Sequence, residues 1–415
     1  MKRLMIIVAA GLLAQVRVAA QVQEFDMTQQ QPVYSDATGY GYDVVDAPDG
    51  KTLKPFFFSV KVDDGNYKVT VTLGAKKKAG MTVVRAESRR LFVEEAVTKK
   101  GEFKDYTFIV NKRSPQIDKK DRVSIKEREK EYLDWDDRLT LEFNGSAPVV
   151  KNIKVEPVKE GVTTVFLCGN STVVDQSSEP YASWGQMIPR WFGPEVAISN
   201  HAESGLTAKT FLGDKRLDKI LAMMQKGDYV FVEFGHNDEK EKYAGCGPWY
   251  HFSYNLKIFV DKVREKGGNI VLVTPTQRRR FEKDKKTFHE THGEFPDAVR
   301  TLAQRENVPL IDLNNMTRDF FVTLGFENSK KALVHYPMGS FANQKKELAD
   351  DTHFNPYGAY EVAKMVVMGM KQLNLPMVQY LSPDFKDYDP KQPDDFTKFV
   401  WYPSAKSDLT KPDGN

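Results

Sequence analysis

The stretch Thr163-Thr164-Val165-Phe166-Leu167-Cys168-Gly169-Asn170-Ser171-Thr172 runs from apolar residues directly into a turn that carries a serine. A short apolar run that ends in turn residues predicts a buried strand. Two later runs end in the same manner: residues 196–198 lead into Asn200-His201-Ala202-Glu203-Ser204-Gly205, and residues 229–234 into Gly235-His236-Asn237-Asp238. Because parallel strands present their carboxyl ends at one edge of a sheet, we expect the three turns to meet there.

Strands and helical stretches alternate from residue 160 to about residue 375. Two more strands are expected at 269–274 and 308–313, and helices around 214–225, 252–266, 295–306 and 356–373. Such alternation predicts an α/β domain over residues 160–375 with a mostly parallel sheet. Ligands of such domains bind beyond the carboxyl ends of the strands, where the three turns are expected.

Residues 21–157 show a different pattern that is rich in strand signals. Tyr67-Lys68-Val69-Thr70-Val71-Thr72-Leu73 alternates apolar and polar residues with period two, which is typical of a half-buried strand. Further strands are expected at 56–62, 82–86, 90–97, 106–110, 139–143 and 149–155. Since no helices alternate with them, we predict a separate β-sandwich domain of jelly-roll or galactose-binding-like type. A role in binding sugars and a purely structural role both fit this prediction.

The first twenty residues have the pattern of a secretory signal peptide. Lys2 and Arg3 precede an apolar run over residues 4–14, and small residues at 18–20 offer a cleavage site. We therefore expect residues 1–20 to be removed during export to the periplasm or the extracellular space. No other segment is long and apolar enough for a transmembrane helix, so no membrane span is expected after cleavage.

Charge and cysteine content narrow the function further. Lys2, Arg3 and Arg17 account for the formal charge of +3, so the remaining chain is close to neutral, which argues against a nucleic-acid partner. Cys168 and Cys246 are the only cysteines, too few for a disulfide framework. One bridge and two free thiols are both compatible with the sequence. Residues 376–415, rich in Pro, Asp and Lys, are expected to form an irregular tail along the surface.

A nucleophile and its base are offered by two of the polar stretches. Ser171 stands in the turn after a strand, and His353 lies in Asp350-Asp351-Thr352-His353, ahead of the last expected helix. In serine acyl transfer a histidine takes the proton of the nucleophile, and a carboxylate holds the imidazole in the required tautomer. Asp350 and Asp351 both qualify for the carboxylate, and Asp350 is favoured because adjacent residues usually point apart. Taken alone, Ser171 would be read as a helix N-cap and His353 as a surface residue.

The same turns offer hydrogen-bond donors for a developing negative charge. We expect the N–H groups of Ser171 and Gly205 and the side-chain amide of Asn237 to form an oxyanion hole. A glycine at 205 lets its backbone approach a ligand closely. As single residues, Gly205 and Asn237 would be explained equally well as a loop glycine and a turn former.

Metal and nucleotide chemistry are not indicated. His201 with Glu203, or His236 with Asp238, offers ligand atoms, but neither pair has the spacing of a recognised metal site. The chain has no phosphate-binding glycine loop. We therefore expect no metal and no cofactor.

Taken together, the four polar stretches resemble the signature blocks of the SGNH (GDSL-type) hydrolases, which carry Ser, Gly, Asn and His in this order. Within that superfamily the chain is similar to the rhamnogalacturonan acetylesterase-like branch. The resemblance implies a flavodoxin-like α/β/α core and metal-free removal of acetyl groups from pectic polysaccharide. It assigns Ser171, Asp350 and His353 to catalysis, and Ser171, Gly205 and Asn237 to the oxyanion hole. One departure is Asn170, which replaces the Asp of the usual Gly-Asp-Ser.

The substrate is less closely defined. Arg278 and Arg279 follow an expected strand and would suit the carboxylates of galacturonate, although a solvated loop explains them as well. Trp184 and Trp249 would either stack on sugar rings or pack inside the protein. The expected partner is an acetylated plant cell-wall polysaccharide or oligosaccharide.

Several alternatives share these residues. They are an esterase acting on another acetylated glycan such as xylan, a lipase or thioesterase on the same scaffold, an acetyl transferase, and a non-catalytic carbohydrate-binding protein. Intact Ser171, Asn237 and His353 argue against the last of these.

Overall fold

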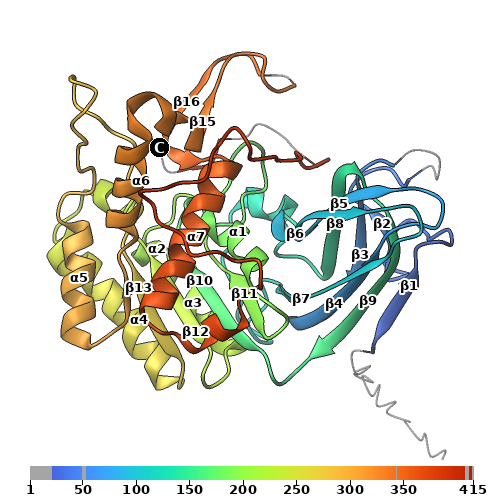
Figure 1. The fold of residues 1–415 in the computed structure, drawn as a ribbon. Helices are drawn as coiled ribbons and strands as arrows, with labels where there is room; N and C mark the ends of the chain where they lie inside the picture. The colour runs from blue at the N-terminus through green and yellow to red at the C-terminus, as the bar shows by residue number, and fades with distance from the viewer. Residues whose placement is uncertain (1–20, 49–52, 343, 407–410, 414–415) are drawn as a thin grey trace, which may run out of the picture.

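A nine-stranded sheet runs through the computed structural model of this chain, with helices on both sides of one half (Figure 1). The structure describes residues 21–48, 53–342, 344–406 and 411–413. The expected signal peptide, residues 1–20, lies outside the described residues. Along the sheet the strand order is β1-β9-β4-β7-β11-β10-β12-β13-β14. The first four strands come from the N-terminal region and the last five from the later α/β region.

The later half of the sheet is parallel. Its strands, in spatial order, are β11 (Val196–Asn200), β10 (Thr163–Cys168), β12 (Tyr229–Glu233), β13 (Asn269–Val273) and β14 (Leu310–Ile311). Counted along the chain this order is 2-1-3-4-5, which is the flavodoxin-like order. It places the topological switch between β10 and β12, the two strands that lead into Ser171 and Asn237. The α/β class with a parallel sheet is confirmed.

Alternate residues of each strand pack against helices on opposite faces. Val165 and Leu167 belong to one apolar cluster, and Phe166 and Cys168 to another. The first cluster includes α1 (Trp184–Met187), α6 (Leu313–Asn328) and α7 (Pro356–Gln372). The second includes α2 (Ala208–Gly213), α3 (Arg216–Met223), α4 (Ser253–Glu265) and α5 (Phe295–Glu306). The result is a three-layer α/β/α arrangement.

One element prediction in this region was wrong in detail. The strand expected at 308–313 spans only Leu310–Ile311, because α6 begins at Leu313. The helix α6 itself was not expected. The helix expected around 214–225 is present as α3, which begins after Lys215, whose φ of 60° lies in the left-handed region.

The N-terminal region is built from two antiparallel groups of strands. The first, continuous with the parallel half, contains β1 (Gln23–Asp26), β9 (Val150–Val158), β4 (Gly65–Leu73) and β7 (Lys104–Lys112). The second is a sheet of β2 (Tyr40–Asp43), β3 (Phe56–Lys61), β8 (Arg138–Ala147), β5 (Gly80–Ala86) and β6 (Arg90–Thr98). Side chains from both groups, such as Val69 and Phe58, form one buried cluster.

The two halves of the nine-stranded sheet meet where β7 and β11 run side by side. Their pairing is parallel and is limited to Val110 with Ile198. The sheet therefore continues across the boundary expected near residue 157. The division into domains at 21–157 and 160–375 remains a prediction.

A short antiparallel pair, β15 (Leu333–Tyr336) and β16 (Leu348–Phe354), stands apart from the main sheet. Asp350 and His353 lie in β16, a strand that was not expected from the sequence. After α7 the tail has one short 3-10 helix, Pro376–Tyr380, and then follows an irregular path, dark red in Figure 1, against the first apolar cluster.

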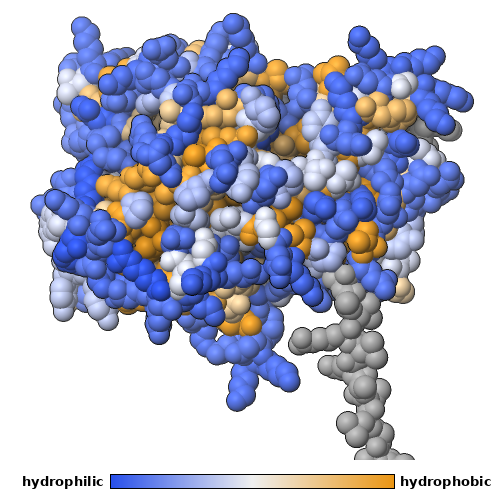
Figure 2. Space-filling view, turned by 60° about the horizontal axis from the view of Figure 1, so that its bottom comes forward, coloured by the Kyte–Doolittle hydropathy of each residue, from blue (hydrophilic) through white to orange (hydrophobic). Residues whose placement is uncertain are grey.

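The surface carries many hydrophilic side chains. Figure 2 shows them around smaller areas of apolar side chains on one face of the molecule. Within the described residues, no helix combines the length and the hydropathy that a membrane crossing requires.

Candidate active site

Three side chains form a hydrogen-bonded line at the carboxyl edge of the parallel strands. The Oγ atom of Ser171 lies 2.9 Å from Nε2 of His353, and Nδ1 of the same ring lies 2.9 Å from Oδ2 of Asp350. All three residues are buried, with exposed fractions of 4%, 1% and 5%. The edge of the Tyr181 ring system packs against the imidazole, at 5.7 Å between ring centroids. This is the spatial order of nucleophile, base and orienting carboxylate.

An irregularity in β16 brings Asp350 and His353 to the same side. Leu333 pairs with Phe354 and His335 with Ala349, so two steps along β15 correspond to five along β16. Residues three apart in a regular strand would face opposite sides. The additional residues bulge out of the ladder and allow both side chains to turn toward Ser171.

The carboxylate of Asp350 is held by hydrogen bonds and by charge. Its Oδ1 accepts the backbone N–H groups of Thr352 and His353 at 2.9 and 3.0 Å, while Oδ2 faces the imidazole. On the other side, Lys411 Nζ lies 3.8 Å from Oδ2. Burial alone would raise the pKa of Asp350, but the hydrogen bond and charge of His353 and the two N–H donors lower it below its usual range. Asp351 pairs instead with Arg279 and His335.

The three donors expected to form the oxyanion hole lie in the loops after β10, β11 and β12. Among the described residues, no acceptor is hydrogen-bonded to the N–H group of Ser171 or of Gly205. Gly205 has φ +80°, a conformation that other residues rarely adopt. Asn237, 6% exposed, gives one amide hydrogen to the carbonyl of Leu206 at 3.0 Å, and an amide carries two. The oxyanion hole of Ser171, Gly205 and Asn237 remains a prediction.

The loops are fixed to one another by hydrogen bonds. Glu203 donates its N–H to the carbonyl of Gly169 at 3.3 Å, which connects the loops that follow β10 and β11. Asp238 accepts from the N–H groups of Gly235 and Ala208 at 3.0 and 2.8 Å. Asn170 accepts from the N–H of Thr172 at 3.1 Å, which an aspartate would also do. The turn that carries Ser171 therefore keeps its side-chain hydrogen bond despite the departure from Gly-Asp-Ser.

Comparisons with known proteins agree with this geometry. The GDSL-like lipase/acylhydrolase family matches residues 167–360. The chain is 40% identical over 219 residues to rhamnogalacturonan acetylesterase RhgT of Bacillus subtilis (strain 168), a match that covers 52% of this chain and 93% of that protein. The chain belongs to the GDSL-like lipase/acylhydrolase family. This hydrolase is therefore a carboxylic ester hydrolase, and the resemblance inferred from the four blocks is confirmed.

Further relatives were found for this GDSL-like hydrolase. Probable rhamnogalacturonan acetylesterase YesY of the same organism is 33% identical over 227 residues, covering 52% of this chain and 95% of that protein. Among solved structures, the crystal structure of protein YxiM from Bacillus subtilis matches 86% of this chain and 100% of its own, with 22% identity and a TM-score of 0.48.

The sequence analysis missed the support that the N-terminal region gives to the nucleophile. Arg89, in the turn before β6, donates to the carbonyls of Gln176 and Tyr181 at 2.8 and 3.0 Å and pairs with Glu179 at 2.9 Å. Gln176 in turn donates to the carbonyl of Ser171 at 2.8 Å. The neighbouring turns of Arg89 and Ser171 come from remote parts of the chain, so no local pattern could have indicated this connection.

The four residues predicted to bind substrate occupy different surroundings. Trp184 is fully buried and donates its indole N–H to Glu233 at 2.6 Å, so the packing alternative holds and stacking on sugar is wrong. Arg279 is 5% exposed and is bound to Asp351 at 2.9 Å, which makes it part of the interior. Arg278 pairs with Glu239. Trp249 is 51% exposed, which leaves it available to a ligand.

The two histidines considered as metal ligands, His201 and His236, are both buried. His201 is buried, its Nε2 lies 2.9 Å from the Ser199 hydroxyl, and burial lowers its pKa well below the usual value. Burial lowers the pKa of His236 in the same way. In the part of the chain that the structure describes, no cluster of three His, Cys, Asp or Glu side chains could hold a metal ion. Cys168 and Cys246 are both free thiols.

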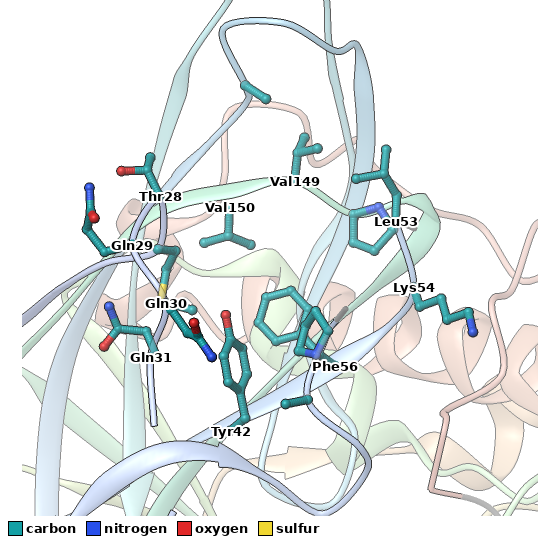
Figure 3. Close-up of a pocket in the computed structure, with 15 residues that line it drawn as sticks. Thr28, Gln29, Gln30, Gln31, Tyr42, Leu53, Lys54, Phe56, Val149 and Val150 are labelled. Atoms are coloured by element: carbon teal, nitrogen blue, oxygen red, sulfur yellow. The ribbon is translucent and has the colours of Figure 1, made fainter. Parts of the chain in front are cut away.

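A separate cavity lies in the N-terminal region (Figure 3). Its volume is about 550 Å³. The residues around it include Gln29, Gln31, Tyr42, Lys54 and Phe56. None of the residues that line it belongs to the Ser171 site.

Proposed function

We propose that this GDSL-like hydrolase removes acetyl groups from pectic polysaccharide of the rhamnogalacturonan type. The observation that carries the proposal is the line of hydrogen bonds from Ser171 through His353 to Asp350, beside the N–H groups of Ser171 and Gly205, which have no acceptor among the described residues. Two relatives named as rhamnogalacturonan acetylesterases support the choice of substrate.

In the first half of the proposed reaction, Ser171 Oγ attacks the carbonyl carbon of the acetyl ester while His353 Nε2 takes its proton. Asp350 keeps the remaining N–H on Nδ1 and stabilises the imidazolium that forms. The carbonyl oxygen becomes negative and is stabilised by the N–H groups of Ser171 and Gly205 and by the Asn237 amide. The bond to the sugar oxygen then breaks, and that oxygen receives the proton from His353.

In the second half, water replaces the sugar. His353 takes a proton from the water, the hydroxide attacks the acetyl group on Ser171, and the same three donors stabilise the second oxyanion. The Ser171–acetyl bond breaks, His353 returns the proton to Ser171 Oγ, and acetic acid leaves and ionises to acetate in water. No metal or cofactor takes part in this scheme.

We also propose that the protein is exported and that residues 21–157 form a β-sandwich domain. The basic and apolar pattern of residues 1–20 supports export. The shared apolar cluster of the two antiparallel groups supports the sandwich.

The Ser171→Ala variant tests the reaction. We expect acetate release from an aryl acetate and from acetylated rhamnogalacturonan to fall by at least about 10³-fold, because the nucleophile is lost while the oxyanion donors remain. Circular dichroism of the variant should match that of the wild type. Activity that survives in a correctly folded variant would refute the mechanism. Parallel assays on acetylated xylan and on long-chain esters separate the proposed substrate from the alternatives.

A further inference from the structure

Two cations from the N-terminal region stand at the edge of the oxyanion hole. They are Lys126 and Arg128, at the start of the 3-10 helix η1 (Glu127–Glu131) between β7 and β8. Lys126 Nζ donates to the carbonyl of Ser204, the residue before Gly205. A methyl group placed on Gly205 would lie 3.2 Å from this Nζ atom.

The segment that carries these cations is fixed to the hydrolase core. Ser124 donates its N–H to the carbonyl of Asp214 at 2.9 Å. Glu129 is fully buried and pairs with Arg216 of α3 at 2.6 Å. Its carboxylate also accepts the backbone N–H of Lys126 at 2.7 Å. The two cations are therefore held in place before any ligand arrives, which reduces the entropy lost on binding.

The C-terminal tail occupies these cations with a carboxylate. Asp413 places Oδ2 3.0 Å from Lys126 Nζ and Oδ1 2.9 Å from Arg128 Nη1, so each oxygen has its own cation. Burial alone would raise the pKa of Asp413, but the hydrogen bond of Lys126 and the charge of Arg128 lower it. The same methyl group on Gly205 would lie 2.9 Å from Cβ of Asp413.

The neighbouring tail residue Lys411 contacts the catalytic carboxylate. Lys411 lies 3.8 Å from the Asp350 carboxylate, and Pro412 is buried between its two exposed neighbours. Three consecutive residues therefore extend from the carboxylate that orients His353 to the glycine of the oxyanion hole.

Charge balance indicates what replaces the tail. Arg128 also binds the buried Glu203, so the set of Lys126, Arg128, Glu203 and Asp413 is neutral when Glu203 is ionised. If Asp413 departs, one positive charge is left uncompensated at the mouth of the site. A carboxylate held by two cations is among the stronger polar contacts in proteins.

We propose that Lys126 and Arg128 form a subsite for a uronate carboxylate next to the acetylated sugar. In the absence of substrate, the Asp413 carboxylate occupies this subsite. The chemical class of the ligand, an acidic glycan, rests on the proposed function. An acidic substrate competes directly with Asp413 for the subsite, whereas a neutral ester does not. Displacement of Asp413 from the subsite is thereby coupled to the charge of the substrate.

The test measures how strongly unacetylated oligogalacturonate inhibits the hydrolysis of a neutral aryl acetate. The inhibition constant is compared between the wild type and its variants. Relative to the wild-type full chain, we expect Lys126→Gln to raise the inhibition constant about tenfold and Asp413→Asn to lower it severalfold, since about 1.4 kcal/mol corresponds to a factor of ten. Lys126→Arg, which keeps the charge, should restore tight inhibition. Lys130→Gln is the matched control, because Lys130 is in the same short helix, 55% exposed and paired with Glu127.

Each outcome bears on the proposal separately from the proposed function. Equal inhibition constants in the wild type, Lys126→Gln and Asp413→Asn overturn the subsite, whatever the enzyme deacetylates. If inhibition weakens in Lys126→Gln and is not restored in Lys126→Arg, the subsite is also overturned. The lysine would then act only through its hydrogen bond to the Ser204 carbonyl. If wild type releases no acetate from acetylated pectins, the proposed function fails, while the inhibition series still decides whether the subsite exists.

Discussion

The two halves of the nine-stranded sheet contribute to the site in different ways. The parallel half has short strands of two to six residues, and two of the loops at their ends carry Ser171 and Asn237. The antiparallel half has three strands of nine residues and supplies none of the reacting groups. Other parts of the N-terminal region nevertheless reach the site twice, through Arg89 between β5 and β6 and through Lys126 with Arg128 between β7 and β8. The reacting groups are thus encoded locally, while support and access come from remote segments.

The comparison predicts that removing support from the N-terminal region damages stability as well as rate. In Arg89→Met, Glu179 loses its buried partner and two carbonyls lose their donor. Breaking a buried ion pair costs about 3–5 kcal/mol. We expect the free energy of unfolding, measured in urea, to fall by about that amount and kcat to fall with it.

Arg305→Met provides the control for this experiment, because Arg305 is 60% exposed and pairs at the surface with its neighbour Glu306. Surface pairs contribute about 0–1 kcal/mol, so its effect should be small. Similar unfolding energies in the two variants would show that the N-terminal region does not support the Ser171 loop.

A substitution of a donor in the parallel half should lower kcat with little loss of stability. Asn237→Ala removes one oxyanion donor, which typically lowers kcat by about 10²–10³-fold. Its lost bond to the Leu206 carbonyl should cost only about 1 kcal/mol in unfolding. Steady-state kinetics on an aryl acetate measure the first effect. An unchanged kcat would exclude the Asn237 amide from the oxyanion hole.

The same contrast explains which features could be predicted from the sequence. The ends of α5 were predicted correctly, and those of α7 to within one residue, because both helices carry apolar residues at regular helical spacing. The loops after β10, β11 and β12 could be placed from apolar runs that end in turn residues. Trp184 and Arg279 were misjudged, because their burial depends on Glu233 and Asp351, which are remote in sequence. The contact of Asp413 with Lys126 joins residues 287 positions apart and has no local pattern.

A buried carboxyl group in the parallel half gives the smallest predicted effect, visible as a dependence on pH. Glu233 accepts hydrogen bonds from Trp184 and Thr172, and its burial raises its pKa from 4.5 to about 7. Below pH 4.5 the group is protonated in both the folded and the unfolded chain, so its contribution to stability is fully present. The contribution is lost as the pH rises through 7, by up to about 3 kcal/mol.

Since Glu233→Gln cannot ionise, the difference in unfolding energy between wild type and variant should shift in favour of the variant between pH 5 and 8. Glu282→Gln, at a site 52% exposed, should show no such shift. A constant difference for Glu233→Gln across this range would mean that the buried carboxyl is already ionised at pH 5, and that its hydrogen bonds outweigh its burial.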